Sequence, residues 1–283
     1  MKSDVKRKDL TSNLLNKVTL RIDFLRIVNI EELVADLQKL LIDKNFFLTN
    51  EDFINDIELQ INDPDVLSED GFKVKKSIKR ERIYIFQNPE DTIDLIVGES
   101  CIIFNVKKCN EKYCFASCIE TFCNVIILAQ EKFKFIRFTR IGLRKINNII
   151  CKDTNLYYCF EKDFFNEINI KDSTKNDNEI KYMRRQSIDN CEFNGHSFNI
   201  LKFIQEGFLD DQERAFNVVL DIDGYIKENI CERFDSYNDL ETMIKKINDD
   251  IFEIFKSMIT EHLINDLISG KSDKVEWGLN KND

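Results

Sequence analysis

The chain has 283 residues, of which 43% are hydrophobic and 33% are charged, and its formal net charge is −10. This balance is typical of a folded globular protein and excludes a disordered chain. The negative charge disfavours nonspecific binding to nucleic acids and to anionic membranes. The basic N-terminus lacks the apolar region of a secretory signal, and no apolar run approaches the roughly 20 residues of a spanning helix. We therefore expect a cytosolic protein.

The first part of the chain predicts one strand, one helix and then a meander. Apolar residues alternate with polar ones over residues 18–24, which predicts a half-buried strand. Asn29 and Glu32 resemble a capping box, and they predict a helix over residues 29–44. Further strands are expected at residues 57–61, 72–77, 83–87 and 94–106, the last broken near Gly98. Because these strands follow one another directly, they favour antiparallel pairing.

The second part predicts two helices separated mostly by strands. The helices are expected at residues 112–131 and 238–269, the latter from a capping box of Asn238 and Glu241 to a stop at Gly270. Residues 172–179 carry no apolar side chain and predict a loop. The strands are expected at residues 133–139, 182–188, 197–204 and 215–222.

This order of elements predicts an α+β protein rather than a doubly wound α/β sheet. We expect two packed halves, residues 1–150 and 151–283, each pairing an antiparallel sheet with helices. The long C-terminal helix would close the second half. Its apolar stripe could also join two copies of the chain in a homodimer.

The nine cysteines indicate a reduced chain rather than a disulfide framework, because their number is odd and many have apolar neighbours. Cys109, Cys114, Cys118 and Cys123 are separated by four, three and four residues. This spacing contains no C-x2-C pair and has no nearby histidine, so we expect core packing and no metal site.

The segment Val218-Val-Leu-Asp-Ile-Asp-Gly-Tyr225 resembles the entry strand of haloacid-dehalogenase-type phosphohydrolases. In that mechanism one aspartate attacks phosphorus and the other acts as acid and base beside Mg²⁺. Tyr225 replaces the usual threonine or valine, and too few residues follow to build the rest of that core. We favour a strand end with structural carboxylates. A metal-dependent phosphohydrolase or nuclease that uses Asp221 and Asp223 stays open as the alternative.

Positive charge is concentrated at residues 132–145, where Phe133, Phe135 and Phe138 interleave with lysine and arginine. Such a segment could bind RNA, with phosphates on the cations and bases on the rings. We favour the other interpretation, in which the rings face the core and the cations face water or pair with carboxylates.

The segment Arg140-x-Gly-Leu-Arg-x-Ile-Asn147 is expected to turn at Gly142, where the missing Cβ allows a bulge or a close contact. Arg140 and Arg144 would then project toward carboxylates, with Asp221 and Asp223 as partners. The candidate binding residues are Arg137, Arg140, Arg144, Asn147, Asp221 and Asp223.

Four segments in this order carry a family resemblance. They are Leu20-Arg-Ile-Asp-Phe24, the segment 140–147, Leu220-Asp-Ile-Asp223 and Ile251-Phe-x-x-Phe-x-x-x-Ile-Thr260. The chain resembles a sporadically distributed family of uncharacterised prokaryotic proteins. Relatives often carry a histidine where this chain has Asn248, which argues against a catalytic role there. The patchy distribution of the family implies accessory genes, such as those of defence or toxin–antitoxin modules.

No nucleotide-binding loop and no nucleophile or metal motif occurs in the sequence. The expected function is therefore that of a non-catalytic binding or regulatory protein without a cofactor. Its expected partner is another protein, and a basic partner would suit the net charge.

Overall fold

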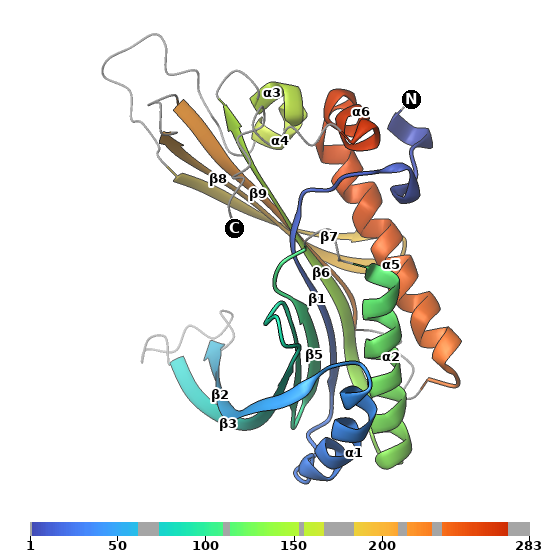
Figure 1. Cartoon of the computed structure of the whole chain (residues 1–283). Coiled ribbons are helices and arrows are strands. Elements are labelled where there is room, and N and C mark those ends of the chain that lie inside the picture. Colours follow the sequence, from blue (N-terminus) through green and yellow to red (C-terminus); the bar gives the residue numbers. More distant parts are fainter. Residues whose placement is uncertain are drawn as a thin grey trace.

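The structure is a computed structural model that describes residues 2–61, 74–109, 114–152, 156–166, 184–208, 214–227 and 234–270. These residues form one large sheet with helices packed on one face (Figure 1). The strands are β1 Leu15–Phe24, β2 Phe47–Ile61, β3 Val74–Gln87, β4 Ile93–Gly98, β5 Cys101–Val106, β6 Phe138–Lys152, β7 Arg184–Phe193, β8 His196–Phe208 and β9 Arg214–Ile226. The helices are the 3₁₀ turns η1 Lys2–Asp4 and η2 Arg7–Asp9, then α1 Glu31–Ile42, α2 Phe115–Lys132, α3 Leu156–Cys159, α4 Lys162–Asn166, α5 Tyr237–Met258 and α6 Glu261–Ser269.

The sheet has nine antiparallel strands in the order β2-β3-β4-β5-β1-β6-β9-β8-β7. The α+β class is therefore shown, whereas two separate sheets are not confirmed. Strands β1 to β5 lie on one side of the β1–β6 seam, and β6 to β9 lie on the other. The seam is hydrogen bonded from Leu15 to Phe24, so both groups of strands share one sheet. The domain division near residue 150 stays a prediction.

Strand β1 shows how the sequence sets the two faces of the sheet. Its residues Val18, Leu20, Ile22 and Phe24 are each at most 3% exposed, whereas the residues between them are polar and more exposed. Successive side chains of a strand point to opposite faces, so this alternation gives one apolar and one polar face. Helices α1, α2 and α5 cover the apolar face (Figure 1). No helix of the described residues covers the opposite face, which we call the helix-free face.

Helix α2 buries an apolar stripe that includes Cys118, Ile119, Phe122 and Ile126. These residues recur at helical spacing, and all of them belong to the same hydrophobic core as β1. The prediction of a helix at residues 112–131 is therefore confirmed from Phe115 onward, with Cys114 as its extended N-cap. Across all of the described residues, no helix is long and apolar enough to cross a membrane.

Both predicted capping boxes are wrong in detail. In α1 the N-cap position is Ile30, and the Asn29 side chain bonds to the Glu32 side chain instead of to the backbone. In α5 the N-cap is Ser236, whose hydroxyl accepts a hydrogen bond from the Asp239 amide. In the sequence, Ser236 stands three residues before Asp239 just as Asn238 stands three residues before Glu241, so this spacing alone does not identify the N-cap residue.

The single C-terminal helix predicted at residues 238–269 is not confirmed, because the chain breaks it into α5 and α6. Ile259 forms an antiparallel bridge with Phe160, and the Thr260 amide donates to the Cys159 carbonyl at 3.0 Å. Thr260 then caps α6 by accepting from the Leu263 amide. The predicted stop is confirmed, since Gly270 adopts a left-handed conformation with φ of 64°.

Two strand predictions are also corrected. The strand expected at residues 133–139 begins only at Phe138, and it continues to Lys152 without the turn expected at Gly142. The strands expected at 72–77 and 83–87 join into β3. The loop expected at residues 172–179 lies outside the described residues.

Candidate functional site

The candidate site is built on the helix-free face, where β6 and β9 lie side by side at the centre of the sheet. Arg140, Gly142 and Arg144 occupy alternate positions of β6, so all three share this face. Asp221 and Asp223 occupy alternate positions of β9 and share the same face. A separation of four residues puts two arginines on one side of a strand as well as on one side of a helix.

The pair of Arg144 and Asp221 contains the most buried carboxylate of this face's arginine–aspartate network. The Arg144 Nε donates to Asp221 Oδ1 at 2.8 Å, and its Nη2 donates to Oδ2. The aspartate side chain is only 5% exposed, whereas the arginine side chain is 49% exposed. The hydrogen bond to Asp221 raises the pKa of the Arg144 guanidinium. The pair therefore neutralises a buried carboxylate and still presents part of a guanidinium to solvent.

Arg140 forms an ion pair with Asp223 on the adjacent strand β9. Its Nη2 donates to the two carboxylate oxygens at 2.9 and 3.1 Å, and its Nη1 lies 3.8 Å from Asp23 on β1. The guanidinium carbon lies 4.8 Å from the centre of the Tyr225 ring. Burial raises the pKa of the Asp223 carboxyl, and the attraction of Arg140 and Arg144 only partly offsets this.

Asp223 and Arg144 belong to a longer polar row, which crosses seven strands of the sheet. Its members are direct cross-strand neighbours in the hydrogen-bonded register. We define the polar row as Asn190, Asn199, Asp223, Arg144, Thr19, Asn105 and Asp94. Neighbouring strands lie about 4.8 Å apart, so the row spans about 29 Å of the helix-free face. Thr19 and Asn105 also bond through their side chains at 2.8 Å.

A second row beside it is largely aliphatic. It runs through Ile188, Leu201, Asp221 and Ile146, again as direct cross-strand neighbours. Ile188 is 60% exposed on the edge strand β7, and Leu201 and Ile146 are partly exposed. The helix-free face thus combines an arginine–aspartate network with accessible apolar side chains.

The structure brings together four of the six predicted site residues, and it confirms the predicted pairing of both arginines with the two aspartates. Asn147 lies elsewhere, because its odd-numbered position in β6 faces the helices, where it is 7% exposed. Arg137 precedes β6, and its carbonyl accepts from the Leu25 amide.

The aromatic residues of the 132–145 segment do not form a continuous platform. Phe133 and Phe138 are buried at 2% and 3% exposure, and only Phe135 is exposed. Lys132 pairs with Asp36 at 3.1 Å. Two of the three rings are therefore unavailable for stacking on bases, which removes the main support for an RNA surface here.

The described cysteines are free thiols, and no group of histidine, cysteine or acidic residues within the described ranges could hold a metal ion. Cys118 and Cys123 lie in the core, where burial raises the pKa of each thiol to about 12. Buried thiols of this kind are protonated and unreactive at neutral pH.

Sequence analysis missed two polar contacts on the helix side of the sheet. His196 pairs through Nδ1 with Asp250 of α5, and the Asn194 side chain donates to the same carboxylate at 2.7 Å. Lys145 is 6% exposed and donates to the Asn248 side chain. The sequence signal for these contacts was weak, because His196 is flanked two residues away by the exposed Asn194 and Lys145 by the polar Asn147.

No family model, curated protein or solved structure matches this chain.

Proposed function

We propose that this protein is a non-catalytic binding protein and that the helix-free face contacts a partner protein. The observation that carries this proposal is the polar row with the half-exposed Arg144 at its centre, beside the partly exposed Ile188, Leu201 and Ile146. Protein interfaces are enriched in arginine and apolar anchors, and their polar groups fix register and orientation.

The dimensions of the row support a macromolecular partner rather than a small ligand. A length of about 29 Å corresponds to one side of a standard protein interface. The net charge of −10 supports a partner that is basic overall. A regulatory component of a defence or toxin–antitoxin module in the cytosol fits this description, and it is the setting that the family resemblance implies.

The enzyme alternative requires Asp221 and Asp223 to be available to a cation. In the structure each carboxylate is bound by a guanidinium, Asp221 by Arg144 and Asp223 by Arg140. A divalent ion would have to replace both contacts. The geometry therefore favours structural carboxylates over metal ligands.

The proposal is tested by co-purification of the tagged chain with the product of the neighbouring gene. Ile188→Glu adds a charge to the exposed edge of the proposed surface, and Val28→Glu adds the same charge at a site that is 73% exposed on the loop before α1. We expect the partner to be retained by the wild type and by Val28→Glu and to be lost from Ile188→Glu.

Two results would contradict the proposal. One is equal retention of the partner by the two variants, with unchanged melting temperatures. The other is Mg²⁺- or Mn²⁺-dependent hydrolysis of phosphate esters or nucleic acids that disappears in Asp221→Asn. The second result would establish the enzyme alternative.

A further inference from the structure

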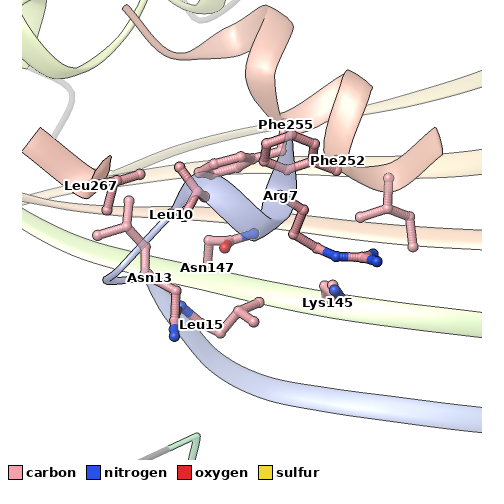
Figure 2. A pocket seen from close by; sticks show the side chains of 11 residues that line it. Arg7, Leu10, Asn13, Leu15, Lys145, Asn147, Phe252, Phe255 and Leu267 are labelled. Atoms are coloured by element: carbon pink, nitrogen blue, oxygen red, sulfur yellow. Dashed lines mark hydrogen bonds between the residues drawn. The ribbon is translucent and has the colours of Figure 1, made fainter. Parts of the chain in front are cut away.

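A pocket lies on the helix side of the sheet, separate from the polar row. It is enclosed by η2 and the residues after it, by β6, and by α5 and α6 (Figure 2). The space between its walls is about 460 Å³ when its open mouth is included, and the cavity itself has a volume of about 70 Å³. The latter corresponds to roughly five to seven waters.

Most of the pocket wall is apolar. The apolar side chains include Leu10, Leu14, Ile251, Phe252, Phe255 and Leu267. Leu14 and Leu267 are buried core residues, so their positions are fixed by packing. A site of this composition takes the hydrocarbon part of a ligand.

Two cationic side chains, Arg7 and Lys145, also line the pocket, and Figure 2 shows both on one side of it, away from Leu267. The Arg7 Nη2 lies 3.3 Å from Asp249 Oδ1. The Arg7 Nη1 is buried and has no hydrogen-bond partner among the described residues. An unpaired guanidinium nitrogen in such a place favours a ligand that supplies an acceptor.

Lys145 reaches the pocket from β6. Its ammonium nitrogen donates to Asn248 Oδ1 and lies 4.7 Å from the centre of the Phe115 ring. Burial, and then repulsion by Arg7, lowers the pKa of Lys145 to about 7, whereas Asp249 acts in the opposite direction. Cys109 also lies nearby, and burial raises the pKa of its thiol to about 11, so it stays neutral.

We propose that this pocket binds a small organic anion, a carboxylate with a short branched or straight apolar chain. The carboxylate pairs with the Arg7 guanidinium and the Lys145 ammonium, and the chain packs against the leucine and phenylalanine side chains. The small cavity volume of about 70 Å³ favours a short ligand such as butyrate or isovalerate. A second charge on the ligand would lie against the apolar wall, which excludes dicarboxylates.

The binding is coupled to a proton. A carboxylate beside Lys145 favours the ammonium form, so binding above neutral pH takes up a proton. A neutral amide of the same shape gains neither the charge contacts nor this proton.

The test is isothermal titration of the full chain with isovalerate and with isovaleramide at a pH near 8, in two buffers of different ionisation enthalpy. We expect saturable one-to-one binding of isovalerate, a heat that depends on the buffer because of proton uptake, and no binding of the amide. Arg7→Gln should weaken isovalerate binding at least about tenfold. Lys8→Gln, which changes an exposed residue of the same turn, should leave it unaltered.

Three results would overturn the proposal, and the first two need only the wild-type chain. They are the absence of saturable binding at millimolar isovalerate, equal binding of isovalerate and isovaleramide, and unchanged binding by a folded Arg7→Gln chain. Inorganic phosphate serves as an anion without a chain, and binding of phosphate as tight as that of isovalerate would also contradict the assigned role of the apolar wall.

Discussion

The guanidinium of Arg140 lies directly beside Gly142 on the helix-free face of β6. A Cβ atom at position 142 would sit 3.2 Å from Arg140 Nη2 and 3.3 Å from its Cζ. The glycine therefore leaves the space through which Arg140 reaches Asp223. This explains a glycine in the interior of a central strand, where its flexibility otherwise weakens the sheet.

We predict that Gly142→Ala destabilises the protein by about 1–2 kcal/mol, because the added methyl group displaces Arg140 and also meets Tyr225 at 3.2 Å. Urea unfolding measures this change. Gly207→Ala in β8 is the matched control, since a Cβ there meets nothing within 4 Å. Equal effects of the two substitutions would show that Gly142 has no special packing role.

We predict that Arg144→Ala lowers the free energy of unfolding by about 3 kcal/mol, because it leaves the buried Asp221 carboxylate unpaired. The second substitution Asp221→Asn removes that charge, so the double variant should recover much of the loss. Arg21→Ala is the control. Arg21 has a similar exposure of 44%, but its partner Asp23 is 20% exposed, so the loss should be under about 1 kcal/mol.

The sheet and helices could be predicted largely because their apolar residues keep a clear period. Strand β1 and helix α2 show this most directly. The continuation of β6 could not be predicted, because Lys145 and Asn147 occupy core-facing positions with polar side chains, at 6% and 7% exposure. These two residues interrupt the apolar alternation, and the same two line the pocket.

The candidate pairs were predictable in part. Residue types and spacing pointed to Arg140, Arg144 and the two aspartates, but their place on one continuous strand was missed because a turn was expected at Gly142. The break between α5 and α6 was not visible in the sequence, because Ile259 continues the helical period. It results from the bridge to Phe160, which is about a hundred residues away in the chain and is a tertiary contact.

We predict that Gly224→Ala is strongly destabilising, because a Cβ there would lie 2.6 Å from Phe198 Cε1 and 3.0 Å from Ile247 Cγ2. Such overpacking costs about 1–3 kcal/mol. Phe198→Leu removes the nearest atom, so the double variant should lose less stability than the sum of the two single variants. Simple additivity would contradict this account of the glycine that follows Asp223.

Lys145 predicts a specific pH dependence. Its pKa is about 7 in the folded chain and near its ordinary value in the unfolded chain. Between these two pKa values only the unfolded state holds the proton, so the free energy of unfolding rises with pH by up to about 1.4 kcal/mol per unit. The same stability is lost again as the pH falls toward 7. Urea unfolding of the wild type and of Lys145→Met between about pH 7 and 9 isolates this effect, because the other titrating groups contribute equally to both chains. Parallel pH profiles of the two chains would show that Lys145 is not desolvated.

The proposed contact between the helix-free face and a partner protein is tested most directly by the affinity of the co-purified partner for Ile188→Glu and Val28→Glu, measured by titration calorimetry. The account predicts at least about tenfold weaker binding for Ile188→Glu, with the affinity of Val28→Glu equal to that of the wild type. Unchanged affinity for Ile188→Glu together with weaker binding by Val28→Glu would contradict it and would place the partner on the helix side of the sheet.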